Sequence, residues 1–186
     1  HEGFYFMHAD TFFEPTIFSG LKEMDQDIIL SVNKKETIKE DMKVVVENNL
    51  VKIINKEMPC EKAYGEFIGL AKISPSIAPL MVNRIKKNIE DGKGNDFFFE
   101  AVIQDLIEMD IDVNFLDIGD KKAIEIDFPD DYSEAKEIFK TIYDNFLIIE
   151  RAIQKQGFTA TKITVQEWQS WQKTLPDIVF LLYLCH

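Results

Sequence analysis

Strand-like runs alternate with segments of helical period over most of the chain, and this alternation constrains the fold more than any other feature. The strand-like runs are rich in β-branched and aromatic residues. They cover residues 3–9, 27–33, 42–48, 50–56, 65–73, 112–118 and 123–127. Apolar residues recur at three- and four-residue spacing in segments 75–90, 98–109 and 131–154. The pattern predicts a layered α/β fold with a mixed sheet.

Two short polar links divide these runs. The pair Asn48-Asn49 is turn-prone and is expected to close a hairpin between the third and fourth strand-like runs. The pair Gly119-Asp120 is expected to join the last two. The strands on either side of the Asn48-Asn49 link should therefore be neighbours in space.

Length and charge limit the function classes. The chain has 186 residues and is 46% hydrophobic, which predicts one globular core. Its formal net charge of -12 argues against nucleic acid and anionic membrane surfaces as partners, because both would repel it. A phosphate-bearing small ligand would need a cation as intermediary. Cys60 and Cys185 fit neither a disulfide framework nor a clustered zinc site, which predicts a cytoplasmic setting.

The composition of the sequence changes beyond about residue 156. Trp168 and Trp171 are the two tryptophans of the chain, acidic residues become sparse, and no clear amphipathic pattern continues. We therefore expect residues 1–154 to belong to one domain and residues 155–186 to form a C-terminal extension of unassigned role. The apolar run 178–185 is far shorter than the roughly 20 residues of a membrane-spanning helix.

The first candidate site is the acidic strand end. Side chains alternate faces along a strand, so Glu125 and Asp127 should project together, roughly 7 Å apart, while Ile124 and Ile126 point the other way. Paired carboxylates suit Mg²⁺, which shares its coordination with waters and substrate phosphates. The alternative is a half-exposed strand with a solvated acidic face.

Asp10 is the second candidate. It follows the first strand-like run, and open α/β sheets bind ligands at the C-terminal ends of their strands. A lone aspartate there can equally be a turn residue or a helix cap. His8, two residues earlier, could touch the same ligand or could simply be satisfied by its neighbours, and the second interpretation is favoured.

Three segments carry a family resemblance in the same order along the chain. HADTFFEP (8–15) is similar to a GD-x-x-F/Y-x-P motif, with His8-Ala9 in place of the more usual residue and glycine. Residues 42–74 are similar to a hairpin followed by a lysine-containing strand and a G-E-x-x-G stretch. IEIDFPDDYSEA (124–135) is similar to W-I-E-I-D-x-x-x-D-x-x-x-A, with Ala123 at the tryptophan position. From about Tyr5 to Ile142, the chain resembles the nucleotidyltransferases that make nucleotide-activated sugars, phosphocholine and aminoethylphosphonate.

This resemblance implies a reaction and a cofactor. A phosphate or phosphonate oxygen of the acceptor would attack the α-phosphorus of a nucleoside triphosphate, CTP being favoured, and pyrophosphate would leave. The acceptor would be phosphocholine-like, an aminoethylphosphonate or a sugar phosphate. By similarity, Asp10 and Asp127 would hold Mg²⁺, and Glu125 would be a third ligand or a partner of the ligands.

The resemblance also suggests acceptor-binding residues. Glu100 would pair with a substrate ammonium and Phe98 would offer a π face, although aromatic core packing is an equal alternative and is favoured for Phe97 and Phe99. Three weaker candidates are Glu66 and Gly69, which would line the acceptor pocket, and Lys56, which would meet a phosphate or else lie on a solvated strand edge.

One family element has no counterpart in this sequence. The family begins with a strand, a G-x-G-x-R type loop and a lysine that grip the triphosphate, and we find no such segment here. We therefore expect a Rossmann-like nucleotidyltransferase fold that is incomplete, with the N-terminal nucleotide-binding half absent, and a chain that is a fragment or an inactive relative. The competing hypothesis is a non-catalytic α/β binding or interaction module with solvated carboxylates.

Overall fold

The computed structural model describes residues 3–93, 98–126 and 128–140. The chain divides into two compact units, His1–Ala123 and Ile124–His186. The predicted boundary between residues 154 and 155 lies outside the described residues and stays a prediction. Within the described ranges, no helix has the length and apolar character needed to cross a membrane.

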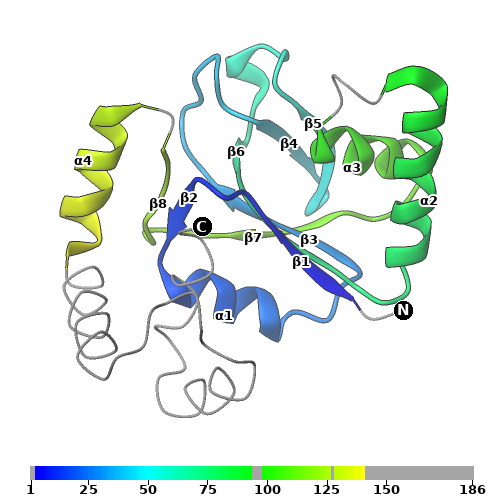
Figure 1. Ribbon diagram of the computed structural model, residues 1–186, viewed down its shortest axis with the longest axis horizontal. Helices are drawn as coiled ribbons and strands as arrows, with labels where there is room; N and C mark the ends of the chain where they lie inside the picture. Colours follow the sequence, from blue (N-terminus) through cyan, green and yellow to red (C-terminus); the bar gives the residue numbers. More distant parts are fainter. Residues whose placement is uncertain (1–2, 94–97, 127, 141–186) are drawn as a thin grey trace, which may run out of the picture. The chain divides into compact units, whose positions relative to one another are not determined.

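The first unit is built on a six-stranded mixed sheet, as the alternating pattern predicted (Figure 1). Its strand order is β5-β4-β6-β3-β7, with β1 also paired to β6. The parallel pair is β3 with β7, and the other ladders are antiparallel. The strands are β1 (Phe4–Met7), β3 (Ile28–Asn33), β4 (Lys43–Glu47), β5 (Leu50–Asn55), β6 (Gly65–Ile73) and β7 (Asn114–Asp117).

Strand β6 organises the sheet because three strands pair with it. Ile73 is opposite both Phe4 of β1 and Ile28 of β3, so β1 and β3 flank β6 on opposite edges. Glu66 is opposite both Asn33 of β3 and Lys43 of β4. One edge of β6 is therefore shared, with β4 at its N-terminal end and β1 at its C-terminal end.

Helices cover the sheet of the first unit. Helices α2 (Ala78–Asn88) and α3 (Phe99–Glu108) contribute Met81, Val102, Ile103 and Leu106 to a buried cluster that includes Ile28, Leu30 and Val32 of β3. Helix α1 (Pro15–Glu23) contributes Ile17 and Leu21 to a second cluster with Ile29. Since neighbouring residues of a strand face opposite ways, the two clusters lie on opposite faces of β3.

Several expectations from the sequence are confirmed at this level. β6 has the predicted bounds, and Asn48 and Asn49 form the β4–β5 turn with φ values of 54° and 61°. A π-helical turn, Ile89–Lys93, follows α2, and its Gly92 has a φ of 81°. A short 3-10 turn, Cys60–Lys62, precedes β6.

Two elements were not anticipated. Strand β2 (Thr11–Phe13) forms a separate two-stranded sheet with β8 (Ala123–Glu125), next to backbone hydrogen bonding between Glu14 and Lys122. Helix α1 begins at Pro15, which suits the first helical turn because its missing N–H would have no partner there. In the second unit, the described helix α4 (Pro129–Ile138) confirms the last predicted helix over residues 131–138 and begins two residues earlier.

Candidate metal-binding site

His8 lies where β1 leaves the edge of β6. Its backbone N–H donates to the carbonyl of Gly69 at 2.8 Å, which extends the β1–β6 ladder by one bond. On the other edge of β6 the register slips, because Leu30 is opposite Ala71 but Val32 is opposite Phe67. Gly69 lies within this bulge, and bulges redirect side chains near functional sites.

Gly69 is required for the position of His8. Its φ of 74° is left-handed, a conformation that glycine adopts without cost. A Cβ on Gly69 would also overlap the ring of His8, so the imidazole packs directly on the glycine backbone. The predicted role of Gly69 in an acceptor pocket stays a prediction, while its close contact with His8 is a structural finding.

The imidazole of His8 is anchored by Glu100. Its Nε2 lies 2.9 Å from Oε1 of Glu100, and the Glu100 residue is only 4% exposed. Glu100 is in the first turn of α3, where the helix dipole favours a negative charge by about 0.3–1 kcal/mol. Edge contacts with Phe6 and Phe67, at ring separations of 5.3 and 6.0 Å, further restrict the His8 ring.

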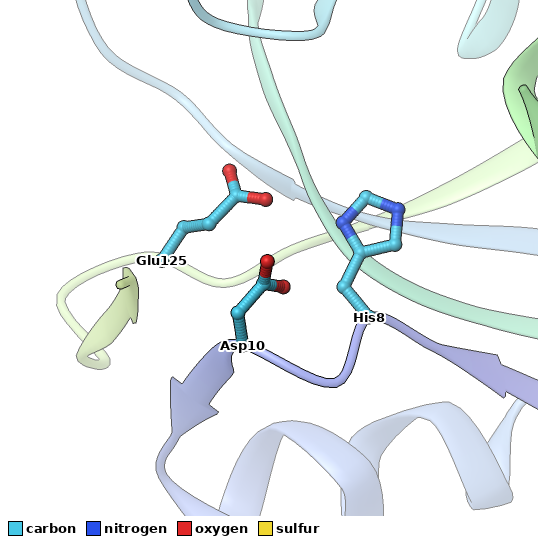
Figure 2. A group of neighbouring side chains, drawn as sticks. All are labelled: His8, Asp10 and Glu125. Atoms are coloured by element: carbon cyan, nitrogen blue, oxygen red, sulfur yellow. The ribbon is translucent and has the colours of Figure 1, made fainter. Parts of the chain in front are cut away.

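Asp10 lies in the turn between β1 and β2 and is exposed. Potential ligand atoms of His8 and Asp10 lie within 4.8 Å of each other. Figure 2 shows the Nδ1 side of the His8 ring turned toward Asp10, while Nε2 is the atom bonded to Glu100. An exposed carboxylate and an oriented imidazole are therefore directed into one region at the end of β1.

The other predicted metal ligands belong to the second unit. Glu125, also labelled in Figure 2, is an exposed residue at the end of β8. Asp127 lies outside the described residues. The metal-binding roles of Glu125 and Asp127 stay predictions.

The aromatic segment before α3 separates into two environments. Phe99 stacks on Phe6 with ring centroids 3.6 Å apart and packs against the core, as expected. Phe98 is 67% exposed, so its ring is accessible, and its contact with an acceptor stays a prediction. Phe97 lies outside the described residues. The proposed pairing of Glu100 with a substrate ammonium also stays a prediction, and Glu100 already contacts His8.

Glu66 belongs to a cluster of three charges in which Asp41 is buried, Glu66 is half-buried and Lys35 is exposed. Lys35 Nζ lies 2.8 Å from Glu66 Oε2 and 3.3 Å from Asp41 Oδ2. Burial raises the pKa of Glu66, the charge of Asp41 adds to the rise, and Lys35 offsets only part of it. Burial alone would lower the pKa of Lys35, but Glu66 and Asp41 together raise it. The acceptor-binding role of Glu66 stays a prediction.

Lys56, the predicted phosphate contact, has an exposed side chain. Its carbonyl accepts a 2.7 Å hydrogen bond from Nζ of Lys43, which is completely buried. Lys43 Nζ also donates to the carbonyls of Lys39 and Asp41, at 2.8 and 3.1 Å. The buried lysine thus joins the loop before β4 to the end of β5. The predicted contact of Lys56 with a phosphate stays a prediction.

Sequence reasoning missed both Lys43 and the partner of His8. Glu100 is 92 positions from His8, and no local pattern connects residues so far apart. The signal that was available is the replacement of the usual motif residues by His8-Ala9, which placed an imidazole two residues before a candidate ligand.

A scan against protein-family models finds none that matches the sequence, and a search of curated proteins finds no relative either. Solved structures do match the fold. The inositol-1-phosphate CTP transferase from T. maritima matches with a TM-score of 0.54 at 21% identity over 75% of this chain. The CTP:phosphocholine cytidylyltransferase from Streptococcus pneumoniae matches with a TM-score of 0.57 at 21% identity over 73% of this chain. The fold is that of the nucleotidyltransferases. A putative glucose-1-phosphate thymidylyltransferase from Bacillus anthracis matches with a TM-score of 0.58 at 10% identity over 74% of this chain.

The nucleotidyltransferase fold is matched over part of its length. This chain covers 57%, 57% and 54% of those three structures, so it spans little more than half of each. The mixed α/β sheet and its helices agree with the predicted fold class. At 10–21% identity, this likeness shows the fold alone.

Proposed function

We propose that the chain is part of a metal-dependent nucleotidyltransferase. In the reaction, an acceptor phosphate or phosphonate oxygen forms a bond to the α-phosphorus of a nucleoside triphosphate. The bond from that phosphorus to the oxygen bridging to the β-phosphate breaks, and pyrophosphate leaves with the electron pair. The likeness to the fold of enzymes whose names state such transfers supports this proposal.

The observation that carries the proposal is the position of Asp10 and His8 at the end of β1. Open α/β sheets bind their ligands beyond the ends of the strands. A carboxylate and an imidazole with potential ligand atoms within 4.8 Å are donors that a divalent ion accepts. In a protein with a net charge of -12, a cation here would also make a triphosphate tolerable.

Mg²⁺ is the proposed cofactor, held by Asp10 with Glu125 and Asp127. When bound, such an ion supplies charge neutralisation at the α-phosphate. The protein side chains would position the two substrates so that the attacking and leaving oxygens are in line. The ligation by Glu125 and Asp127 rests on the resemblance of residues 124–135 to the family motif.

CTP and an acceptor carrying phosphate or phosphonate are the proposed substrates, in a cytoplasmic setting. The likeness of residues 124–135 to the phosphocholine branch supports CTP, and two of the matched structures carry CTP in their names. The third is named a thymidylyltransferase, so the nucleotide has to be tested directly. The exposed ring of Phe98 is a suitable contact for the ammonium of a choline-type acceptor.

The test is a turnover assay on the product of the complete reading frame that contains this sequence. Each of CTP, UTP, dTTP and ATP is combined with phosphocholine, 2-aminoethylphosphonate, glucose 1-phosphate and inositol 1-phosphate, with Mg²⁺ present. We expect acceptor-dependent release of pyrophosphate, greatest with CTP. Asp10→Asn should lower kcat/KM by about 100-fold or more, and Asp120→Asn, at an exposed carboxylate of the β7–β8 link, should not.

Two outcomes would oppose the proposal. Absence of pyrophosphate release with every combination would favour a non-catalytic binding module. Release that is unchanged in Asp10→Asn would show that the chemistry takes place elsewhere in the protein.

A further inference from the structure

The contact between His8 and Glu100 orients the imidazole in a particular way. Nε2 is the ring nitrogen within hydrogen-bond distance of the Glu100 carboxylate, at 2.9 Å. A carboxylate accepts from an N–H, so in the neutral imidazole this contact places the proton on Nε2 and the lone pair on Nδ1. Nδ1 is on the side of the ring that faces Asp10 (Figure 2).

We propose that His8, oriented by Glu100, is a metal ligand together with Asp10, and that its imidazole makes the site favour a first-row transition-metal ion such as Mn²⁺ over Mg²⁺. The proposal concerns the ion site of the proposed function. Ion binding by His8 and Asp10 can be measured without turnover, so the two proposals can fail separately.

The chemistry of the donors supports this selectivity. Mg²⁺ prefers oxygen ligands and keeps several waters, and carboxylates alone satisfy it. An imidazole suits the later divalent ions better, and affinity for a mixed nitrogen and oxygen site rises from Mn²⁺ toward Cu²⁺. Replacing a ligand oxygen or water by His8 therefore raises affinity for transition-metal ions more than affinity for Mg²⁺.

The surroundings of His8 resemble those of a metal-binding histidine. Such histidines commonly donate their second ring N–H to a carboxylate, which fixes the tautomer and makes the ligating nitrogen more basic. Here the carboxylate is the buried Glu100, and the ring is confined by Gly69, Phe6 and Phe67. The ring needs little reorganisation to accept an ion.

A purely structural histidine is the competing interpretation. Such a residue would be held by the bond to Glu100 and by ring packing, and it would not need an exposed carboxylate beside it. The His8 side chain instead keeps 26% of its surface exposed, and Asp10, its partner within 4.8 Å, is itself exposed. Accessible donors arranged around one region favour a site that takes an ion from solvent.

The first experiment measures Mn²⁺ binding by the full chain without nucleotide, using the EPR signal of free Mn²⁺, with Mg²⁺ as competitor. We expect saturable binding that is tighter for Mn²⁺ than for Mg²⁺. His8→Asn should weaken Mn²⁺ binding by about 10-fold or more and Mg²⁺ binding by less. The ratio of Mn²⁺ affinity to Mg²⁺ affinity should therefore fall in this variant. Asp10→Asn should weaken binding of both ions.

Glu100 is tested as a positioning residue. Glu100→Ala should weaken Mn²⁺ binding by about 10- to 100-fold. Glu100→Gln should retain more affinity, because its amide oxygen still accepts a hydrogen bond from Nε2. Asp120→Asn is the control and should bind as the unmodified chain does. Thermal unfolding of each variant shows whether a loss of binding is simply a loss of fold.

A direct readout on His8 is available from long-range ¹H–¹⁵N NMR of the imidazole. We expect the Nε2–H tautomer without metal and selective paramagnetic loss of the His8 signals on adding Mn²⁺. An Nδ1–H tautomer, absence of saturable Mn²⁺ binding, or a His8→Asn variant with an unchanged ion preference would overturn the proposal. Ion binding as described with no turnover would refute only the proposed function.

Discussion

Nε2 of His8 lies 2.9 Å from Oε1 of Glu100 although 92 positions separate the two residues. This contact joins the end of β1 to the first turn of α3, and the stacking of Phe6 on Phe99 joins the same two elements. The geometry of the candidate site therefore depends on how α3 packs on the sheet. Substitutions that disturb this packing should affect the site as well as the stability.

Gly69→Ala tests the glycine beneath the His8 ring. The left-handed φ of 74° should cost an alanine about 1–2 kcal/mol. The new Cβ would in addition displace the imidazole, so we expect Mn²⁺ binding to weaken together with stability. Urea denaturation and Mn²⁺ titration measure the two effects.

Gly119→Ala is the matched control for this substitution. Gly119 also has a left-handed φ, of 61°, but a Cβ there would meet no atom within 4 Å. The Gly119→Ala variant should therefore be destabilised by a similar amount, through its backbone conformation alone, and should keep its affinity for Mn²⁺. Equal Mn²⁺ affinity in the two alanine variants would show that the contact of Gly69 with His8 does not matter for the site.

The fold was largely predictable because its elements leave local signals. β6 is a run of nine residues that reads as a strand, and the Asn48-Asn49 pair accepts the positive φ of a tight hairpin turn. Strand β2 and helix α1 were not predicted, because a three-residue strand and a nine-residue helix are too short to show a clear period of apolar residues. The rest of the fold is set by packing rather than by local pattern.

The site was predictable only in part. Asp10 was identified from its position after a strand, whereas the partner of His8 comes from a distant helix. A sequence pattern reports neighbours along one element, and contacts across the fold depend on tertiary packing. The burial of Lys43 could not be predicted from the sequence for the same reason. Its three hydrogen-bond acceptors are backbone carbonyls, which every residue has.

Lys43→Met should destabilise the first unit. Methionine fills a similar volume but donates no hydrogen bond, so the carbonyls of Lys39, Asp41 and Lys56 lose their common donor. Since an unsatisfied buried group costs about 1–3 kcal/mol, we expect a loss of about 2–5 kcal/mol in the free energy of unfolding. Lys39→Met, at an exposed side chain, should change it by about 0.5 kcal/mol or less. Comparable losses in the two variants would contradict the role of Lys43.

Asp105→Ala tests how α2 is held against α3. Oδ2 of Asp105 accepts hydrogen bonds from Nε of Arg84 at 2.7 Å and from Nδ2 of Asn88 at 2.8 Å. Asn88 is only 2% exposed, and its amide would lose this partner. We expect a loss of about 1–3 kcal/mol in unfolding free energy, measured by urea denaturation, with little change in Asp112→Ala, where the aspartate is exposed. A stable Asp105→Ala variant would mean that apolar packing alone fixes α2.

Glu66 should give the first unit a recognisable dependence on pH. Because burial raises the pKa of Glu66 above its ordinary value of 4.5, the folded state holds this proton at pH values where the unfolded chain has released it. The contribution to stability is therefore complete below about pH 4.5 and is lost as the pH rises through the folded-state pKa.

Glu66→Gln removes this titration. We expect the unfolding free energy of the unmodified chain, relative to that of the variant, to fall as the pH is raised from about 4.5 toward neutrality. Urea denaturation of both proteins across this range measures the difference. Glu47→Gln, at an exposed glutamate of β4, is the control and should follow the unmodified chain. Parallel profiles for Glu66→Gln and the unmodified chain would show that Lys35 compensates fully for the burial of the Glu66 carboxylate.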